Sequence, residues 1–175
     1  MTFQSKNIIF IKLYDIIKVI KTLIQPEGGD FKSMKLELIS YESIGVLELG
    51  MENEDIVKAL SIKPITFKKS EYECVDDFEV MHVYYEGGKS VGFEFFPPIE
   101  IIFKGINLST GKIFQVTQVF LQLDENLKTD KYGFISYKYG FAIYGKEEYV
   151  DSIFVFKEGY YSTYINVTKL KANIY

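Results

Sequence analysis

Hydrophobic and polar residues recur along the chain in two similar blocks, each predicting a short helix followed by several strands. The first block starts with a predicted helix, Asn53–Ile62, and continues with the alternating segments Glu79–Tyr85, Val91–Phe96 and Ile99–Ile106. The second starts with Lys112–Leu123 and continues with Gly133–Tyr139, Phe141–Tyr144 and Asp151–Phe156. A helix plus an antiparallel meander, used twice, is expected to build one continuous sheet with helices on one face.

Further elements precede these blocks. Apolar residues at helical spacing between Ile8 and Ile24 predict an amphipathic N-terminal helix, which Pro26 and the following glycines end. Leu36–Tyr41 alternates and predicts a strand. We therefore expect one α+β domain spanning residues 1–175, with a central antiparallel sheet and flanking helices. Its parts are an N-terminal helix at about 8–24, a first repeat at about 45–106 and a second at about 107–161.

Composition favours strands. The chain has 14 Tyr and 15 Phe and no Trp, so aromatic residues make up 17% of it. Tyr and Phe suit half-buried sheet faces, which explains the number through architecture alone. An aromatic binding face is the functional alternative, because Tyr offers a large rigid contact area at low entropic cost.

Charge is unevenly distributed. Residues 37–100 hold 14 acidic residues against 5 lysines, although the whole chain has a net charge of −4. All 20 basic residues are lysine, and the absence of arginine argues against nucleic-acid recognition and phosphoryl transfer. The acidic run from Glu71 to Glu79 is either a solvated face or a surface for a basic partner.

The sequence offers no catalytic or metal-binding constellation, so we predict a protein that is not an enzyme and that needs no cofactor. His82 is the single histidine and lies in an alternating segment, which fits a sheet position better than a catalytic base. Cys74 is the single cysteine, so neither a disulfide nor a zinc site is expected. The Gly105–Lys112 loop lacks the spacing and the Ser/Thr of a phosphate-binding loop. No carboxylate pair stands out for acid–base chemistry.

No apolar run approaches the roughly 20 residues of a membrane span, and no signal peptide is evident. A lone cysteine suits a reducing compartment. We therefore expect a cytoplasmic protein with no membrane contact.

Several segments together resemble bacterial immunity proteins of contact-dependent growth inhibition systems, in the branch that neutralises metal-dependent DNase toxins. The resemblance covers roughly residues 35–161 and is carried by the following segments: Gly45–Met51, the helix Glu54–Leu60, Val83–Tyr85, Val91–Phe96, Gly105–Leu108 and Phe154–Tyr161. It implies a central antiparallel sheet with flanking helices, similar in outline to Whirly proteins. It also implies a 1:1 complex in which a hairpin of the toxin's C-terminal nuclease domain extends the sheet of the immunity protein.

The family's toxin-binding surface diverges, so contact residues are predicted here from physics. A DNase is basic where it meets DNA, and an inhibitor gains from a complementary acidic face. The candidate toxin-binding residues are Glu71, Tyr72, Glu73, Asp76, Asp77, Glu79, Tyr84, Tyr85, Glu86, Phe93, Glu94 and Phe95. About half of these are expected in the core, because alternation sends neighbours to opposite faces. Reversing Asp76 and Asp77 to lysine is expected to slow association with the toxin.

Two alternatives remain open. One is an α+β adaptor or inhibitor that binds a protein other than a toxin. The other is a Whirly-like binder of single-stranded nucleic acid, for which a cationic groove beside stacking aromatics is needed. The acidic middle of the chain and the missing arginine oppose the second alternative.

Overall fold

The structure, a computed structural model, describes residues 34–68, 74–146 and 148–162. All of them belong to one compact unit, Lys32–Tyr175, of the two into which the chain divides. The other unit, Met1–Phe31, holds the helix predicted at 8–24 and lies outside the described residues. The expectation of one domain over the whole chain therefore stays a prediction.

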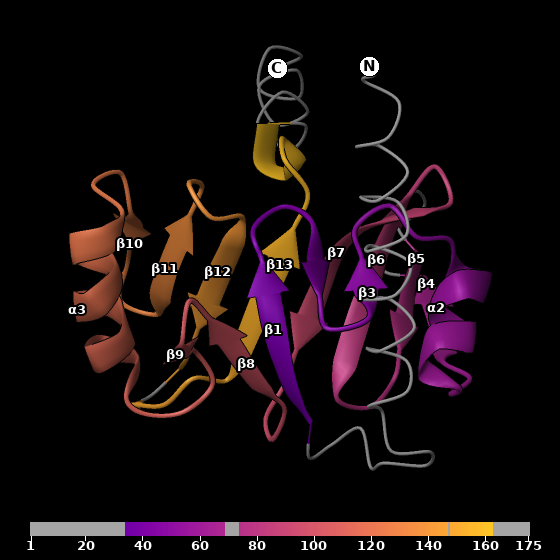
Figure 1. Cartoon of the computed structure of the whole chain (residues 1–175), viewed down its shortest axis with the longest axis horizontal. Helices are drawn as coiled ribbons and strands as arrows, with labels where there is room; N and C mark the ends of the chain where they lie inside the picture. Colours follow the sequence, from indigo (N-terminus) through magenta and orange to yellow (C-terminus); the bar gives the residue numbers. More distant parts are fainter. Residues whose placement is uncertain (1–33, 69–73, 147, 163–175) are drawn as a thin grey trace, which may run out of the picture. The chain divides into compact units, whose positions relative to one another are not determined.

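The larger sheet contains eight strands, all antiparallel, in the order β10-β11-β12-β13-β7-β6-β5-β4 (Figure 1). The first four in sequence are β4 Ile65–Lys68, β5 Cys74–Asp77, β6 Met81–Glu86 and β7 Lys89–Phe95. The last four are β10 Lys128–Thr129, β11 Gly133–Ser136, β12 Phe141–Tyr144 and β13 Ser152–Phe156. Each group is a meander in chain order, and the two groups join where β7 pairs with β13.

A second, five-stranded sheet has the order β3-β2-β1-β8-β9. Its strands are β1 Lys35–Ile39, β2 Ser43–Ile44, β3 Leu47–Glu48, β8 Glu100–Phe103 and β9 Ile106–Asn107. The expectation of one continuous sheet was therefore wrong for the segment Ile99–Ile106, which leaves the first meander and pairs in parallel with β1. The protein is mostly β-sheet with a few helices, loosely α+β.

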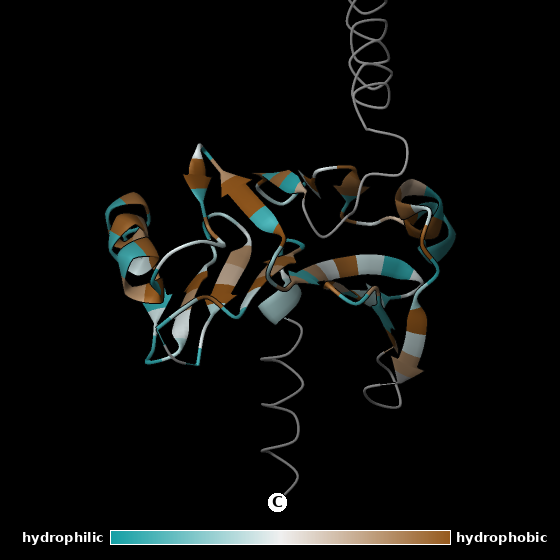
Figure 2. Ribbon diagram, turned by 90° about the horizontal axis from the view of Figure 1, so that it is seen from below, coloured by the Kyte–Doolittle hydropathy of each residue, from teal (hydrophilic) through white to brown (hydrophobic). Residues whose placement is uncertain are grey.

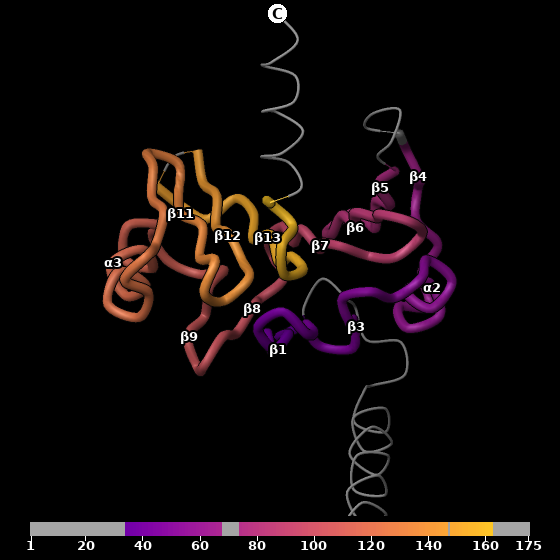
Figure 3. The backbone as a smooth tube through the Cα atoms, turned by 90° about the horizontal axis from the view of Figure 1, so that it is seen from above, coloured from indigo at the N-terminus to yellow at the C-terminus, as the bar shows by residue number. Residues whose placement is uncertain are grey.

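Two helices, α2 Asn53–Leu60 and α3 Ile113–Leu123, precede the two meanders. Figures 2 and 3 place α3 near the β11 end of the larger sheet and α2 at the opposite end, with the smaller sheet between them. Phe120 of α3 reaches into the layer between the sheets, since its ring centroid lies 6.1 Å from Phe103 of β8 and 5.2 Å from Phe141 of β12. α3 thus helps to fill one side of the larger sheet, and Asn53 of α2 donates a hydrogen bond to buried Asp76 of β5.

The side chains that face this filled layer are buried. One register row runs across the larger sheet through Asp76, Val83, Phe93, Val155, Phe141 and Ser136, and all six are buried. Burial of each large apolar side chain contributes about 1.5–3 kcal/mol. We call this side of the larger sheet its inner face and the opposite side its outer face.

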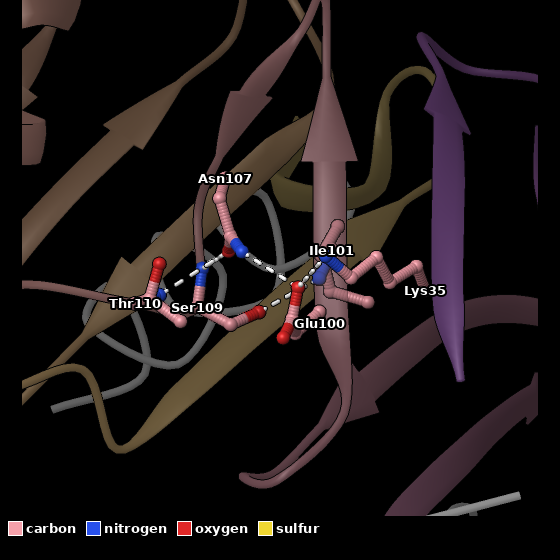
Figure 4. A network of polar contacts seen from close by, with 6 residues as sticks. All are labelled: Lys35, Glu100, Ile101, Asn107, Ser109 and Thr110. Carbon is pink, nitrogen blue, oxygen red and sulfur yellow. Dashed lines mark hydrogen bonds and ion pairs between the residues drawn. The ribbon is translucent and has the colours of Figure 1, made fainter. Parts of the chain in front are cut away.

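Polar side chains hold together β8, β9 and the loop that precedes α3 (Figure 4). Asn107 donates to Glu100 over 2.9 Å and accepts from the backbone N–H groups of Ser109 and Thr110. The Ser109 hydroxyl accepts from the Ile101 N–H over 2.8 Å, and Lys35 of β1 pairs with Glu100 over 3.0 Å. The Gly105–Lys112 loop therefore uses its polar groups to hold β9 against β8.

Candidate functional site

The outer face of the larger sheet is partly open across its whole width. One register row runs through all eight strands and consists of Ile65, Asp77, His82, Glu94, Phe154, Ala142, Ile135 and Lys128. None of these eight residues is buried, in contrast to the six inner-row residues, which occupy adjacent positions on β5 to β7 and β11 to β13. The outer face is covered only in part, because Val75 and Tyr84 are buried there, and its open part is the candidate binding surface.

A groove of about 920 Å³ lies on this face over the second meander. Its floor includes Phe154, Ala142 and Ile135, three successive members of the outer row. The small Ala142 side chain stands between two large ones and leaves a hollow. The other lining residues are Tyr84, Glu94, Lys128, Thr129, Asp130, Gly133, Phe134, Ile143, Tyr144, Ser152, Tyr160 and Tyr161.

Aromatic rings form one wall of the groove. Phe154 meets Tyr84 of β6 edge to face at 5.3 Å and Tyr160 of the last described turn at 5.1 Å. Together with Val75 and Val91 these three side chains form an apolar cluster on the outer face. The wall is held tightly at its base, because a Cβ at Gly92 would lie 2.6 Å from the Phe154 ring.

A polar cluster adjoins this wall. The Tyr84 hydroxyl donates to Glu94 Oε2 over 2.6 Å. His82 lies beside two carboxylates, with its Nδ1 3.8 Å from Glu94 Oε2 and its Nε2 3.8 Å from Asp77 Oδ1. The His82 ring also packs edge to face against Phe96 at 4.8 Å. Within the described residues no serine, threonine or cysteine hydrogen-bonds to this imidazole, so the cluster offers charge and hydrogen bonds without an activated nucleophile.

The acidic residues predicted to bind a partner divide between the two faces. Asp77 and Glu94 lie half-buried on the outer face, and Glu79 is exposed in the turn between β5 and β6. Glu86 is exposed at the β6–β7 hairpin and pairs with Lys157. Glu71, Tyr72 and Glu73 lie outside the described residues.

Four of the predicted contact residues point inward. Phe93 and Phe95 are core residues with 0% and 2% of their surface exposed, and Asp76 is 2% exposed. Asp76 accepts hydrogen bonds from Asn53 at the start of α2 and from the Thr66 hydroxyl. Burial, and then the hydrogen bond to Asp76, raises the pKa of the Tyr85 phenol far above its usual value, so Tyr85 stays neutral inside this network. These four side chains face the inner side of the sheet, so lysine at Asp76 would perturb the core as well as any surface contact.

The groove contains residues that sequence reasoning did not select, above all Phe154, Ala142 and Tyr160. Each lies far along the chain from Tyr84 and Glu94, and the β7–β13 pairing brings them together. The sequence did indicate a strand at Ser152–Phe156, since the outward positions Phe154 and Phe156 are apolar as well as the intervening Ile153 and Val155. That pattern is typical of a strand buried on both sides, but it does not identify the neighbouring strand.

Comparison with protein-family models, curated protein sequences and solved structures found no match. No described helix is long and apolar enough to cross a membrane. Among the described residues, no group of three or more His, Cys, Asp and Glu side chains is placed to hold a metal ion.

Proposed function

We propose that this chain is a cytoplasmic immunity-type protein that holds a basic nuclease toxin in an inactive 1:1 complex. The observation that carries the proposal is the outer face of the larger sheet, which is partly open among the described residues and holds a groove of about 920 Å³. A concave, largely apolar surface with a few polar groups is the usual form of a recognition site. The sequence resemblance supplies the class of partner.

Strand addition at β4 fits this proposal. In the described part of the chain β4 is the last strand of the larger sheet, and it exposes 74% of Ile65 and 40% of Phe67. A sheet edge with exposed apolar side chains accepts an extended segment, whose main chain continues the ladder. A toxin hairpin paired with β4 would lie beside Asp77, the neighbour of Ile65 in the outer row.

Charge supports a basic partner. Asp77, Glu79 and Glu94 lie on or next to the outer face between β5 and β7. A cluster of carboxylates raises the rate at which a cationic protein arrives in the correct orientation.

We also infer that the scaffold consists of two helix-plus-meander repeats. The sheet order supports this, because α2 precedes β4 to β7, α3 precedes β10 to β13, and the two meanders meet at their last strands. The strands β8 and β9 mark where this simple scheme ends, since they pair with β1 instead.

Co-expression with the product of the neighbouring upstream gene tests the function. The full chain is expected to co-purify with that product as a 1:1 complex and to suppress its nuclease activity, and a gel-shift titration at low salt is expected to show no binding of naked single-stranded DNA. Ile65→Lys, which places a charge on the β4 edge, is expected to weaken the complex at least about tenfold, as a disfavoured edge contact would.

Ile62→Lys is the matched control, because Ile62 is also exposed but precedes β4. A complex weakened equally by both substitutions would remove β4 from the interface. Absence of any complex would overturn the immunity function.

A further inference from the structure

We propose that the end of the groove at Glu94 binds a basic side chain, lysine or arginine, carried by an otherwise apolar segment of a protein partner. The inference deepens the proposed function and rests on it for the identity of the partner. Its physical basis is a carboxylate and a set of aromatic rings that converge at one end of an apolar groove.

Glu94 supplies the charge. Its side chain is 24% exposed and lines the groove. Within the described residues no lysine ammonium lies within 4 Å of this carboxylate, whose contacts are the Tyr84 hydroxyl at 2.6 Å and His82 Nδ1 at 3.8 Å. Two carboxylate oxygens accept about four hydrogen bonds in total, so acceptor capacity remains for a cation. A half-buried carboxylate with spare capacity favours an ammonium or guanidinium partner over a neutral donor.

Aromatic rings complete the pocket. Tyr84, Phe154 and Tyr160 form a continuous chain of edge-to-face contacts beside Glu94, and Phe154 is the register partner of Glu94 itself. Rings within about 6 Å attract a cation through their electron-rich faces and cover its methylene stem. The carboxylate and the rings thus recognise the two parts of a lysine or arginine side chain together.

The rest of the groove sets the chemistry of the flanking residues. Ala142 and Ile135 continue the floor away from Glu94, and exposed Lys128 stands at the far end of the row. Glu94 and Lys128 are four strand spacings apart, which is about 19 Å at about 4.8 Å per strand. This length accommodates roughly six residues of extended chain. A short apolar segment with its basic residue at the Glu94 end matches the groove in both length and charge.

Two capped peptides that differ in charge alone test the pocket. The probes are acetyl-Val-Arg-Val-amide and its neutral isostere acetyl-Val-citrulline-Val-amide, titrated into the full ¹⁵N-labelled chain by NMR. The arginine peptide is expected to shift the amide signals of residues 94, 142 and 154 and to bind at least about tenfold more tightly than the citrulline peptide. Glu94→Gln keeps an acceptor for the Tyr84 hydroxyl. It is expected to reduce the affinity for the arginine peptide to that for the citrulline peptide.

Ala142→Leu fills the hollow and is expected to weaken the binding of both peptides. Glu54→Gln is the control, because Glu54 is exposed on α2 and does not line the groove, and it is expected to change the affinity of neither peptide. Equal affinity of the two peptides, unchanged affinity in Glu94→Gln, or no shifts at these amides would each overturn the inference. Peptide binding without any toxin complex would leave the pocket in place and remove the toxin assignment. A toxin complex whose affinity is unchanged in Glu94→Gln, without any peptide binding, would remove the pocket and keep the toxin assignment.

Discussion

Asp76 sits in a closed set of hydrogen bonds between α2 and the larger sheet. Its carboxylate accepts from Asn53 of the helix and from Thr66 of β4, and it also bonds the Tyr85 phenol of β6. A buried carboxylate is stable when its neighbours satisfy it, and each neighbour depends on it in turn. One residue therefore links a helix to three strands.

Removing this carboxylate is expected to destabilise the fold. Asp76→Ala removes a buried acceptor from half-buried Asn53, whereas exposed Thr66 regains water, so the free energy of unfolding is expected to fall by about 1–3 kcal/mol. Urea denaturation measures the change. Asp55→Ala is the control, because Asp55 is exposed in the first turn of α2 and its loss costs less than about 1 kcal/mol. Similar losses in both variants would contradict the role given to Asp76.

The helices and strands were largely predictable, while their partners were not. The predicted helix Lys112–Leu123 corresponds to α3 Ile113–Leu123, and the predicted strand Val91–Phe96 to β7 Lys89–Phe95. Glu86 and Lys89 close the hairpin between β6 and β7, and Gly87 and Gly88 both have positive φ there. Alternation reports that a segment is extended and which residues share a face. It does not report that β8 pairs with β1, some 65 residues away, or that β7 pairs with β13.

The same limit applies to the candidate site. Tyr84 and Glu94 were predicted because they lie in an acidic and aromatic stretch, and both line the groove. Phe154 and Ala142 were not, because their place beside Glu94 depends on the register of two strands that are distant in sequence. Inward residues such as Phe93 were included because the sequence does not show which face of a strand will be covered.

The junction of the two meanders offers a test at the scale of strands. Gly92 of β7 lies under the Phe154 ring of β13, and an added Cβ would lie 2.6 Å from that ring. Gly92→Ala is therefore expected to destabilise the protein by about 1–3 kcal/mol through overpacking. In a Phe154→Leu background the same substitution is expected to cost less, because the smaller side chain leaves space. A double-mutant cycle by urea denaturation measures the coupling, and an equal cost in both backgrounds would exclude the contact as the cause.

At the scale of the whole molecule, the position of acidic residues matters more than the modest net charge of −4. Glu79 lies at the turn between two strands of the outer face, whereas Glu54 lies on α2, and both are exposed. Charges separated by more than about 8 Å are largely screened at physiological ionic strength. A basic partner that approaches the outer face therefore experiences the first charge more strongly than the second.

Charge reversal distinguishes these two positions. Glu79→Lys is expected to lower the association rate with the proposed basic toxin about three- to tenfold at low salt, and the difference is expected to shrink as salt is added. Glu54→Lys, with the same change in net charge, is expected to have a smaller effect. Stopped-flow measurements at several salt concentrations provide the comparison. Equal effects of the two variants would place the partner elsewhere.

The pairing of β7 with β13 also has a consequence during synthesis on the ribosome. Phe95 of β7 pairs with Ile153 of β13, so the earlier strand waits for a partner that is made 58 residues later. At the usual translation rates of about 5–20 residues per second, the wait lasts roughly 3–12 seconds. Throughout that interval the nascent first meander has an unpaired apolar edge at Val91–Phe95, which is open to aggregation or to a chaperone. The last of the described strands thus closes the centre of the sheet.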